Sequence, residues 1–250
     1  MLKISKGLAI GLTTTLAILS VAVFFLLKAP DAQAQAEAAT PPTPPSSATD
    51  AISHPPAATP DLLAAPAASS IDVTVAMQDR VLGQESAPVT IIEYASLTCP
   101  HCAHFETEIL PEVKKQLLDT GKAKLIYRDF PLDRFALEAA MVSRCISPLK
   151  YYDMLDVIFS KQEIWAKAKD PLAALEKLAS LAGMDAADYK SCVENHALET
   201  AILTHVQEAQ NKYKVQSTPT FVFNDGAEQF SGAQPVEKFA ATIEKLTKGK

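Results

Sequence analysis

The sequence predicts an α/β domain in which a helical insertion separates a β–α–β unit from a closing β–β–α unit. Three observations predict this fold. Two β-branched and aromatic segments, 88–96 and 124–132, flank a helical pattern that starts at a pair of closely spaced cysteines. A run of helical patterns follows at about 134–213. A β-hairpin and a last helix then complete a small mixed sheet with helices on both faces.

The chain begins with a segment that predicts membrane attachment. Lys3 and Lys6 precede an uncharged apolar run at 7–27, which is long enough to span a bilayer as a helix. Residues 1–28 are therefore predicted to be an anchor with its N-terminus in the cytoplasm. A cleaved signal is the alternative, because "DAQAQA" at 31–36 offers Ala-x-Ala triplets to a signal peptidase.

Residues 29–70 predict a disordered linker. They hold nine of the 17 prolines and few bulky apolar side chains, so they cannot bury enough surface to offset the entropy of ordering. Residues 71–250 are left as one domain, and they are numerous enough to form a core. Whether the N-terminal segment is kept or cleaved, this domain is expected on the periplasmic side of the inner membrane or in the periplasm, where disulfides persist.

The first half of the domain is predicted from short local patterns. Residues 71–76, "IDVTVA", are a weak strand candidate, whereas "PVTIIEYAS" at 88–96 and "KLIYRDFPL" at 124–132 are strong ones. Between the two strong strands, apolar residues recur every four positions from Phe105 to Leu117, which indicates one face of a helix. Pro111 lies inside that helix and is expected to kink it.

The second half is predicted from capping and turn residues. Ser147-Pro148 and Asp170-Pro171 each indicate an N-cap followed by proline at the first helical position. Gly183 indicates the end of the second of these helices. Further elements are a helix capped by Asp185, a helix that contains Ile202, Val206, Ala209 and Tyr213, strands at 218–223 and 227–230 around a turn at 224–226, and a helix from about Pro235 to Leu246.

The cysteine motif Cys99-Pro100-His101-Cys102 carries the chemistry. A CxxC that opens the helix of a β–α–β unit indicates a thioredoxin-like redox site. Cys99 lies where unpaired N–H groups and the helix dipole favour a thiolate, and His101 can add a positive charge or a donor. Cys102 lies one turn deeper in the helix. We therefore expect Cys99 to form the mixed disulfide with a substrate and Cys102 to resolve it.

The segments "IIEYASLTCPHC" at 91–102 and "VQSTPTFVF" at 215–223, with the helical insertion between them, resemble the DsbA family of periplasmic thiol oxidants. The resemblance covers most of residues 75–248. Thioredoxins proper usually carry Trp before the first cysteine and Gly-Pro between the two, whereas this chain has Thr98, Pro100 and His101. The resemblance implies that the chain introduces disulfide bonds into reduced substrate proteins. It also implies reoxidation by a quinone-linked membrane partner of the DsbB type.

Three more residues are expected to support the site. A central strand tolerates proline poorly, so Pro219 after Thr218 suggests a turn of the chain toward the CxxC. The resemblance implies that this proline is cis and that Thr218 tunes redox behaviour and substrate binding. Glu93 lies in an otherwise apolar strand, where a buried carboxylate with a raised pKa could exchange protons with Cys102. The family's acidic residue at the matching position supports this role.

Cys145 and Cys192 are the two remaining cysteines, and both fall in the helical insertion. Leftover cysteines in an oxidising compartment usually pair, so they are predicted to form a structural disulfide; two buried free thiols are the alternative. Some members of the family have a second disulfide in the insertion, which agrees with pairing.

Several other functions compete with this one. A zinc site needs further ligands at short spacing, which the isolated Cys145 and Cys192 do not supply, and no metal or cofactor is expected. A net charge of −6 without a basic cluster argues against nucleic acid as a partner. A thiol reductase or a disulfide isomerase stays open, although isomerases commonly need a dimerisation module and this chain is expected to be a monomer. A non-catalytic domain that holds unfolded chains is a further alternative, which the intact CxxC disfavours.

Overall fold

The computed structural model describes residues 71–248. The predicted anchor over 1–28 and the predicted linker over 29–70 lie outside the described residues. No helix within 71–248 combines the length and the apolar character that crossing a membrane requires.

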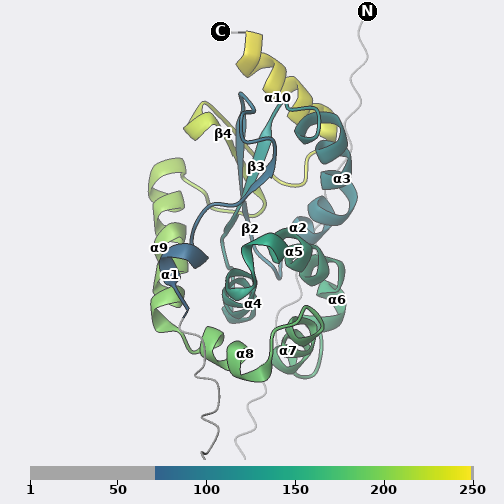
Figure 1. Cartoon of the computed structure of the whole chain (residues 1–250). Helices are drawn as coiled ribbons and strands as arrows, with labels where there is room; N and C mark the ends of the chain where they lie inside the picture. Colours follow the sequence, from purple (N-terminus) through teal and green to yellow (C-terminus); the bar gives the residue numbers. More distant parts are fainter. Residues whose placement is uncertain (1–70, 249–250) are drawn as a thin grey trace, which may run out of the picture. The chain divides into compact units, whose positions relative to one another are not determined.

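A five-stranded mixed sheet forms the centre of the part of the domain that lies outside the helical insertion (Figure 1). Its spatial order is β1-β3-β2-β4-β5, with β2 and β3 parallel and the other pairs antiparallel. Four predicted strands are confirmed, and β1 is a short edge strand that the sequence patterns did not indicate. The strands are β1 Val81–Gly83, β2 Thr90–Ala95, β3 Lys124–Asp129, β4 Thr220–Phe223 and β5 Glu228–Ser231.

The strand expected at 71–76 is wrong, because this segment contains the short helix α1, Val73–Ala76. Asp72 caps the helix: its Oδ1 accepts hydrogen bonds from the N–H groups of Thr74 at 2.9 Å and Val75 at 3.2 Å. This local cap satisfies two free N–H groups of the first turn and outweighs the β propensity of the valines.

The helix after the CxxC runs from Pro100 to Leu118 in four pieces. It begins as α2, Pro100–His104, passes through a π-helical turn at Phe105–Ile109, continues as α3, Leu110–Val113, and ends in a second π-helical turn at Lys114–Leu118. The interruption expected at Pro111 thus takes the form of a π turn just before the proline. Its wider hydrogen-bond spacing accommodates a residue that has no N–H to donate.

The helical insertion contains α4 to α9, and α10 closes the chain. Pro148–Lys150 forms a 3-10 turn before α5, and the Ser147 side chain makes no capping hydrogen bond there, unlike the predicted cap. Asp170 and Asp185 do cap the helices that follow them. The helices are α4 Arg134–Cys145, α5 Tyr151–Ser160, α6 Gln162–Trp165, α7 Pro171–Leu181, α8 Ala186–Val193, α9 His196–Tyr213 and α10 Val236–Lys248.

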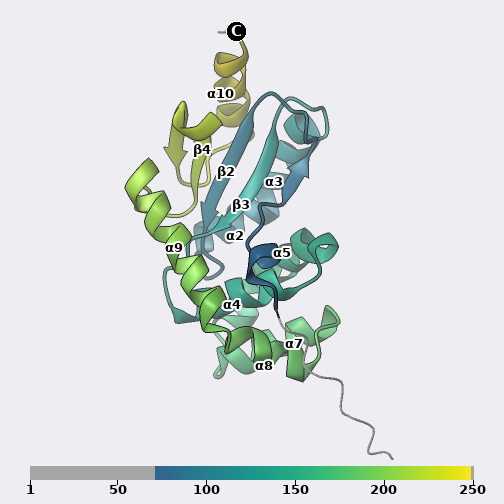
Figure 2. The same ribbon diagram turned by 60° about the vertical axis from the view of Figure 1, so that its left-hand side comes forward.

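Helices cover both faces of the sheet. One face packs the side chains of Ile91 and Phe221 against Phe105 of the π turn and Phe239 of α10. The opposite face packs Ile92 and its neighbours against α9, which runs from the helical block back along the sheet (Figure 2). Because strand side chains alternate between faces, Glu93 shares the first face with Ile91 and points toward the helix that follows the CxxC.

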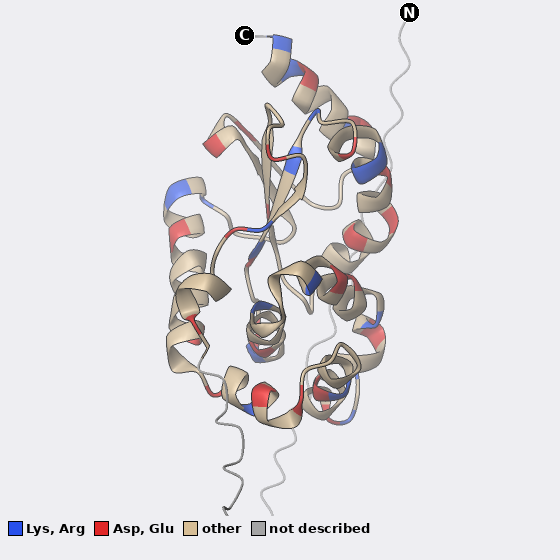
Figure 3. Cartoon of the chain, in the orientation of Figure 1, with Lys and Arg blue, Asp and Glu red and all other residues tan. Residues whose placement is uncertain are grey.

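Charged residues of both signs are interspersed along the outer sides of the described helices (Figure 3). One ion pair is buried instead: Arg144 Nε lies 2.7 Å from Asp129 Oδ2, and both side chains are almost fully enclosed. Burial alone would lower the pKa of Arg144, but the Asp129 carboxylate raises it above its ordinary value. The pair therefore fixes α4, the first helix of the insertion, to the end of β3.

Candidate redox site

The CxxC lies at the carboxyl end of β2, between the sheet and the helical insertion. Cys99 is the N-cap of α2, with extended backbone angles (φ −79°, ψ 120°), and Pro100 is its exposed first residue. Both cysteines belong to the core cluster that the insertion forms with the end of β2. Cys99 keeps 8% of its surface exposed and Cys102 keeps none, so Cys99 is the more accessible of the two cysteines.

The site favours a thiolate on Cys99, because its pKa falls to about 5. The largest cause is a hydrogen bond from the neighbouring Cys102 thiol, and burial opposes it. Thr218 and the backbone N–H groups of Cys102 and His101 lower the pKa further. The N–H groups are those of the first helical turn, which have no partner within the helix. Cys99 is therefore largely ionised at neutral pH and ready to attack a disulfide.

Cys102 is shifted in the opposite direction. Burial raises the pKa of its thiol far above the ordinary value, and the charge on Cys99 and the nearby Glu93 raise it further. At neutral pH the reduced site therefore holds one thiolate, on Cys99, and one thiol, on Cys102. This asymmetry separates the attacking sulfur from the resolving sulfur.

A loop from the far half of the chain lies against Cys99. The peptide bond between Thr218 and Pro219 is cis, and the Cys99 Sγ lies 3.5 Å from the Thr218 carbonyl oxygen. The Thr218 hydroxyl is buried and has no hydrogen-bond partner among the described residues. A hydrogen bond from the Thr218 side chain is one of the causes that lower the pKa of Cys99.

Glu93 is fully buried in β2, and burial, followed by the nearby Glu106, raises its pKa well above the ordinary range. Neither carboxylate oxygen of Glu93 has a hydrogen-bond partner among the described residues. Burial also raises the pKa of Glu106, to about 8. Burial therefore favours the protonated form of the Glu93 carboxyl, and Glu93 is close enough to Cys102 to act on the pKa of its thiol.

Glu106 was missed in the sequence. It lies four residues after Cys102, on the same side of the helix. This spacing, taken together with the expected burial of Glu93, would have indicated that Glu106 lies near the redox site.

The His101 side chain is exposed and makes no hydrogen bond to another described residue. The contribution of this residue to the Cys99 thiolate comes from its backbone N–H. The expectation that the imidazole adds charge or a donor therefore stays a prediction. No group of three or more His, Cys, Asp or Glu side chains within 71–248 could hold a metal ion.

The sequence did not indicate a contact between the start of the insertion and the CxxC loop. Asp133, which precedes α4, accepts a hydrogen bond from the Thr98 hydroxyl at 2.6 Å through one carboxylate oxygen. Its other oxygen accepts from the N–H of Ala136 at 2.9 Å and so caps α4. One carboxylate thus joins the residue before Cys99 to the first helix of the insertion.

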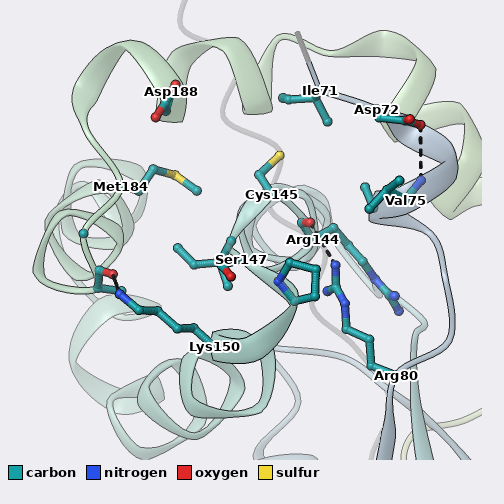
Figure 4. Close-up of a pocket in the computed structure, with 15 residues that line it drawn as sticks. Ile71, Asp72, Val75, Arg80, Arg144, Cys145, Ser147, Lys150, Met184 and Asp188 are labelled. Carbon is teal, nitrogen blue, oxygen red and sulfur yellow. Dashed lines mark hydrogen bonds between the residues drawn. The ribbon is translucent and has the colours of Figure 1, made fainter. Parts of the chain in front are cut away.

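Cys145 and Cys192 form a disulfide that joins the end of α4 to α8. Cys192 is completely buried, whereas Cys145 lies in the wall of a cavity of about 410 Å³. Figure 4 shows Cys145 there beside Arg144, whose carbonyl oxygen accepts a hydrogen bond from Arg80. The lining of this cavity does not include Cys99 or Cys102, although Cys192 belongs to the same core cluster as the CxxC.

Comparisons with known proteins agree with this geometry. The family model described as Thioredoxin matches residues 76–245. The crystal structure of Wolbachia pipientis alpha-DsbA1 superposes with a TM-score of 0.62 at 30% identity, covering 68% of this chain and 91% of that one. Disulfide bond formation protein D of Bacillus subtilis is 26% identical over 175 residues, which cover 68% of this chain and 78% of that protein.

A Rickettsia felis protein whose name places it among the protein-disulfide oxidoreductases is 31% identical over 147 residues. The match spans 58% of this chain but only 53% of the Rickettsia protein, about half of its length. The family model and the Wolbachia structure cover most of the described domain. The chain belongs to the thioredoxin family and, within it, to the DsbA-like proteins.

Proposed function

We propose that the chain is a thiol-disulfide oxidoreductase that oxidises the thiols of substrate proteins through Cys99 and Cys102. The observation that carries the proposal is the opposite shift of the two cysteines: an accessible thiolate on Cys99 beside a buried thiol on Cys102. A stabilised thiolate stabilises the reduced form, and a protein whose reduced form is stable gives its disulfide away.

In the oxidising direction, a substrate thiolate attacks Cys99 Sγ, the Cys99–Cys102 bond breaks, and Cys102 leaves as a thiolate that takes up a proton. A second substrate thiolate then attacks the substrate sulfur of the mixed disulfide and releases Cys99 as a thiolate. The substrate gains one disulfide, and the chain gains the two electrons. Glu93 and Glu106 are the groups we propose to exchange the proton with Cys102.

The alternatives within the same chemistry are a reductase and an isomerase. Thioredoxin itself has a nucleophile pKa of about 7 and a potential of about −270 mV, whereas DsbA itself has about 3.5 and about −120 mV. The pKa of Cys99, about 5, falls between the two. We therefore expect a potential between these limits, less negative than that of thioredoxin.

Equilibration with glutathione buffers of graded composition measures this potential directly, with the Cys99→Ser variant as the inactive control. A potential clearly above about −270 mV supports the oxidant. A value at or below it would support the reductase instead. Reactivation of a protein with scrambled disulfides, measured in parallel, would indicate an isomerase.

We propose that the domain works outside the cytoplasm and that a DsbB-type quinone-linked partner reoxidises it. The Cys145–Cys192 disulfide supports the compartment, because such bonds persist in oxidising surroundings. The partner is proposed from family membership alone. Trapping Cys99 in cells tests both: Cys99 and Cys102 should be found oxidised when the quinone-linked oxidase is present and reduced when it is deleted. Oxidation that does not depend on such an oxidase would contradict the proposed partner.

A further inference from the structure

The helical insertion reaches the CxxC through one buried amide. Gln162 is the first residue of α6, and only 4% of its surface is exposed. Its side-chain Nε2 donates to the carbonyl oxygen of Leu97 at 2.9 Å and to that of Cys99 at 3.1 Å. Both hydrogens of the amide are thus used on the backbone on either side of Thr98, just before the redox helix begins.

The Cys99 carbonyl is also the group that starts α2. It accepts hydrogen bonds from the N–H groups of Cys102 and Ala103, each at 3.1 Å, and Gln162 supplies a third donor. The orientation of this carbonyl decides where the first helical turn points. The N–H groups of that turn are among those that lower the pKa of Cys99. A donor on the Cys99 carbonyl also offsets the negative end of a dipole that lies close to the thiolate.

We propose that Gln162 is a positioning residue of the redox site: its amide holds the peptide groups around Cys99 in the arrangement that the reactive thiolate requires. The insertion then contributes to the reactivity of Cys99, in addition to packing against the redox site. This inference rests on the proposed function, because it concerns the reactivity of the same cysteine.

The competing explanation is that Gln162 only ties α6 to the loop. In that case its loss would lower stability but leave the pH dependence of Cys99 unchanged. The two explanations therefore differ in the pH profile of the Cys99 reaction. The titratable groups around the CxxC are Cys102 and His101 on α2, Glu106 on the π turn that follows, Glu93 on β2, and Asp133 through Thr98. The variants described below leave all of them in place.

The test uses Gln162→Met, which keeps the length of the side chain but has no donor. The rate of alkylation of Cys99 in the reduced full chain is measured against pH, together with the thermal unfolding midpoint. We expect the midpoint of the pH profile to rise by roughly one pH unit, the shift that corresponds to about one lost hydrogen bond. Below both midpoints the alkylation rate should then fall about tenfold.

The matched control is Trp165→Phe in the same short helix. Trp165 is fully buried, and its Nε1 donates to the Ile158 carbonyl oxygen at 2.9 Å, so its loss removes a comparable buried donor that does not touch the CxxC loop. We expect a lower unfolding midpoint with an unchanged pH profile. A second variant, Gln162→Glu, places an acid where the donor was and should raise the midpoint of the profile at least as far as Gln162→Met.

The outcomes separate the inference from the function on which it rests. A wild-type midpoint near that of an ordinary thiol would contradict the proposed function itself. A low wild-type midpoint that neither Gln162 variant moves would overturn the inference alone. Failure of both Gln162 variants to fold, while Trp165→Phe folds, would assign Gln162 to folding and also overturn the inference.

Discussion

Replacing Cys102 by alanine should trap the chain in covalent complexes with its substrates, whereas replacing Cys99 by serine should abolish thiol exchange completely. The reason is the division of labour between the two sulfurs. When the Cys99 thiolate attacks a substrate disulfide it forms a mixed disulfide, and Cys102, whose thiol hydrogen-bonds to the Cys99 sulfur, is the other free cysteine of the described residues that can resolve it. A serine hydroxyl has no comparable thiolate and forms no disulfide.

Non-reducing electrophoresis of the Cys102→Ala variant with a disulfide-containing substrate measures the effect. We expect adducts that disappear on reduction, and none with Cys99→Ser or with the double variant. The largest single cause of the low pKa of Cys99 is the Cys102 thiol, so the trapping variant should also react more slowly below neutral pH. Equal trapping by Cys99→Ser would exchange the roles of the two cysteines.

We propose that the Cys145–Cys192 disulfide is structural, and its removal should have the largest effect on stability. The two cysteines are 47 positions apart, and the chain-entropy model gives about 4 kcal/mol for closing a loop of this size. For a domain of this length, this corresponds to a fall of roughly 8–16 °C in the unfolding midpoint. Cys192 lies in the core of the insertion, so removal of the disulfide should destabilise α4 and α8 together.

The comparison is between the wild type and the Cys145→Ala/Cys192→Ala double variant, with thermal unfolding of each in the oxidised form. The alkylation rate of Cys99 serves as the second readout. We expect it to stay near the wild-type rate, because the groups that lower the pKa of Cys99 are Cys102, Thr218 and the first N–H groups of α2, and the disulfide is not among them. An unchanged unfolding midpoint would remove the structural role.

The parts of the fold that could be predicted are those that local patterns specify. The β-branched runs at 88–96 and 124–132 became buried central strands, because a central strand is covered on both faces and its sequence shows it. The CxxC could be predicted as well, since its chemistry depends on a spacing of three residues and on a helix N-terminus.

The parts that could not be predicted depend on a single contact or on tertiary structure. One Asp72 side chain converted a β-branched segment into α1, and β1 is only three residues long, too short to show alternation. In the sequence, Gln162 looks like a glutamine on the exposed side of a helix, so nothing indicates that it is buried. Its place beside Cys99 arises only when α6 packs on the loop that precedes α2.

The role of the His101 imidazole also remains to be measured, because the structure assigns the contribution of this residue to its backbone N–H. His101→Ala keeps that N–H and removes only the imidazole. A higher pKa of Cys99 in this variant would support the side-chain role expected from the sequence. An unchanged value would leave the backbone as the whole contribution of His101.

The proposed chemistry requires the reduced site to hold a thiolate on Cys99 and a neutral thiol on Cys102. A pH titration of thiolate absorbance in the reduced wild-type chain, with the Cys99→Ser variant as the reference, tests it most directly. A lowered pKa means that the ionised, reduced form gains stability relative to the unfolded chain as pH rises above about 5, and loses it as pH falls through that value. We expect one thiolate that titrates near pH 5 and is absent from Cys99→Ser, with Cys102 still protonated at alkaline pH. A single transition near the ordinary thiol value of about 8.5, or two thiols that titrate together, would contradict it.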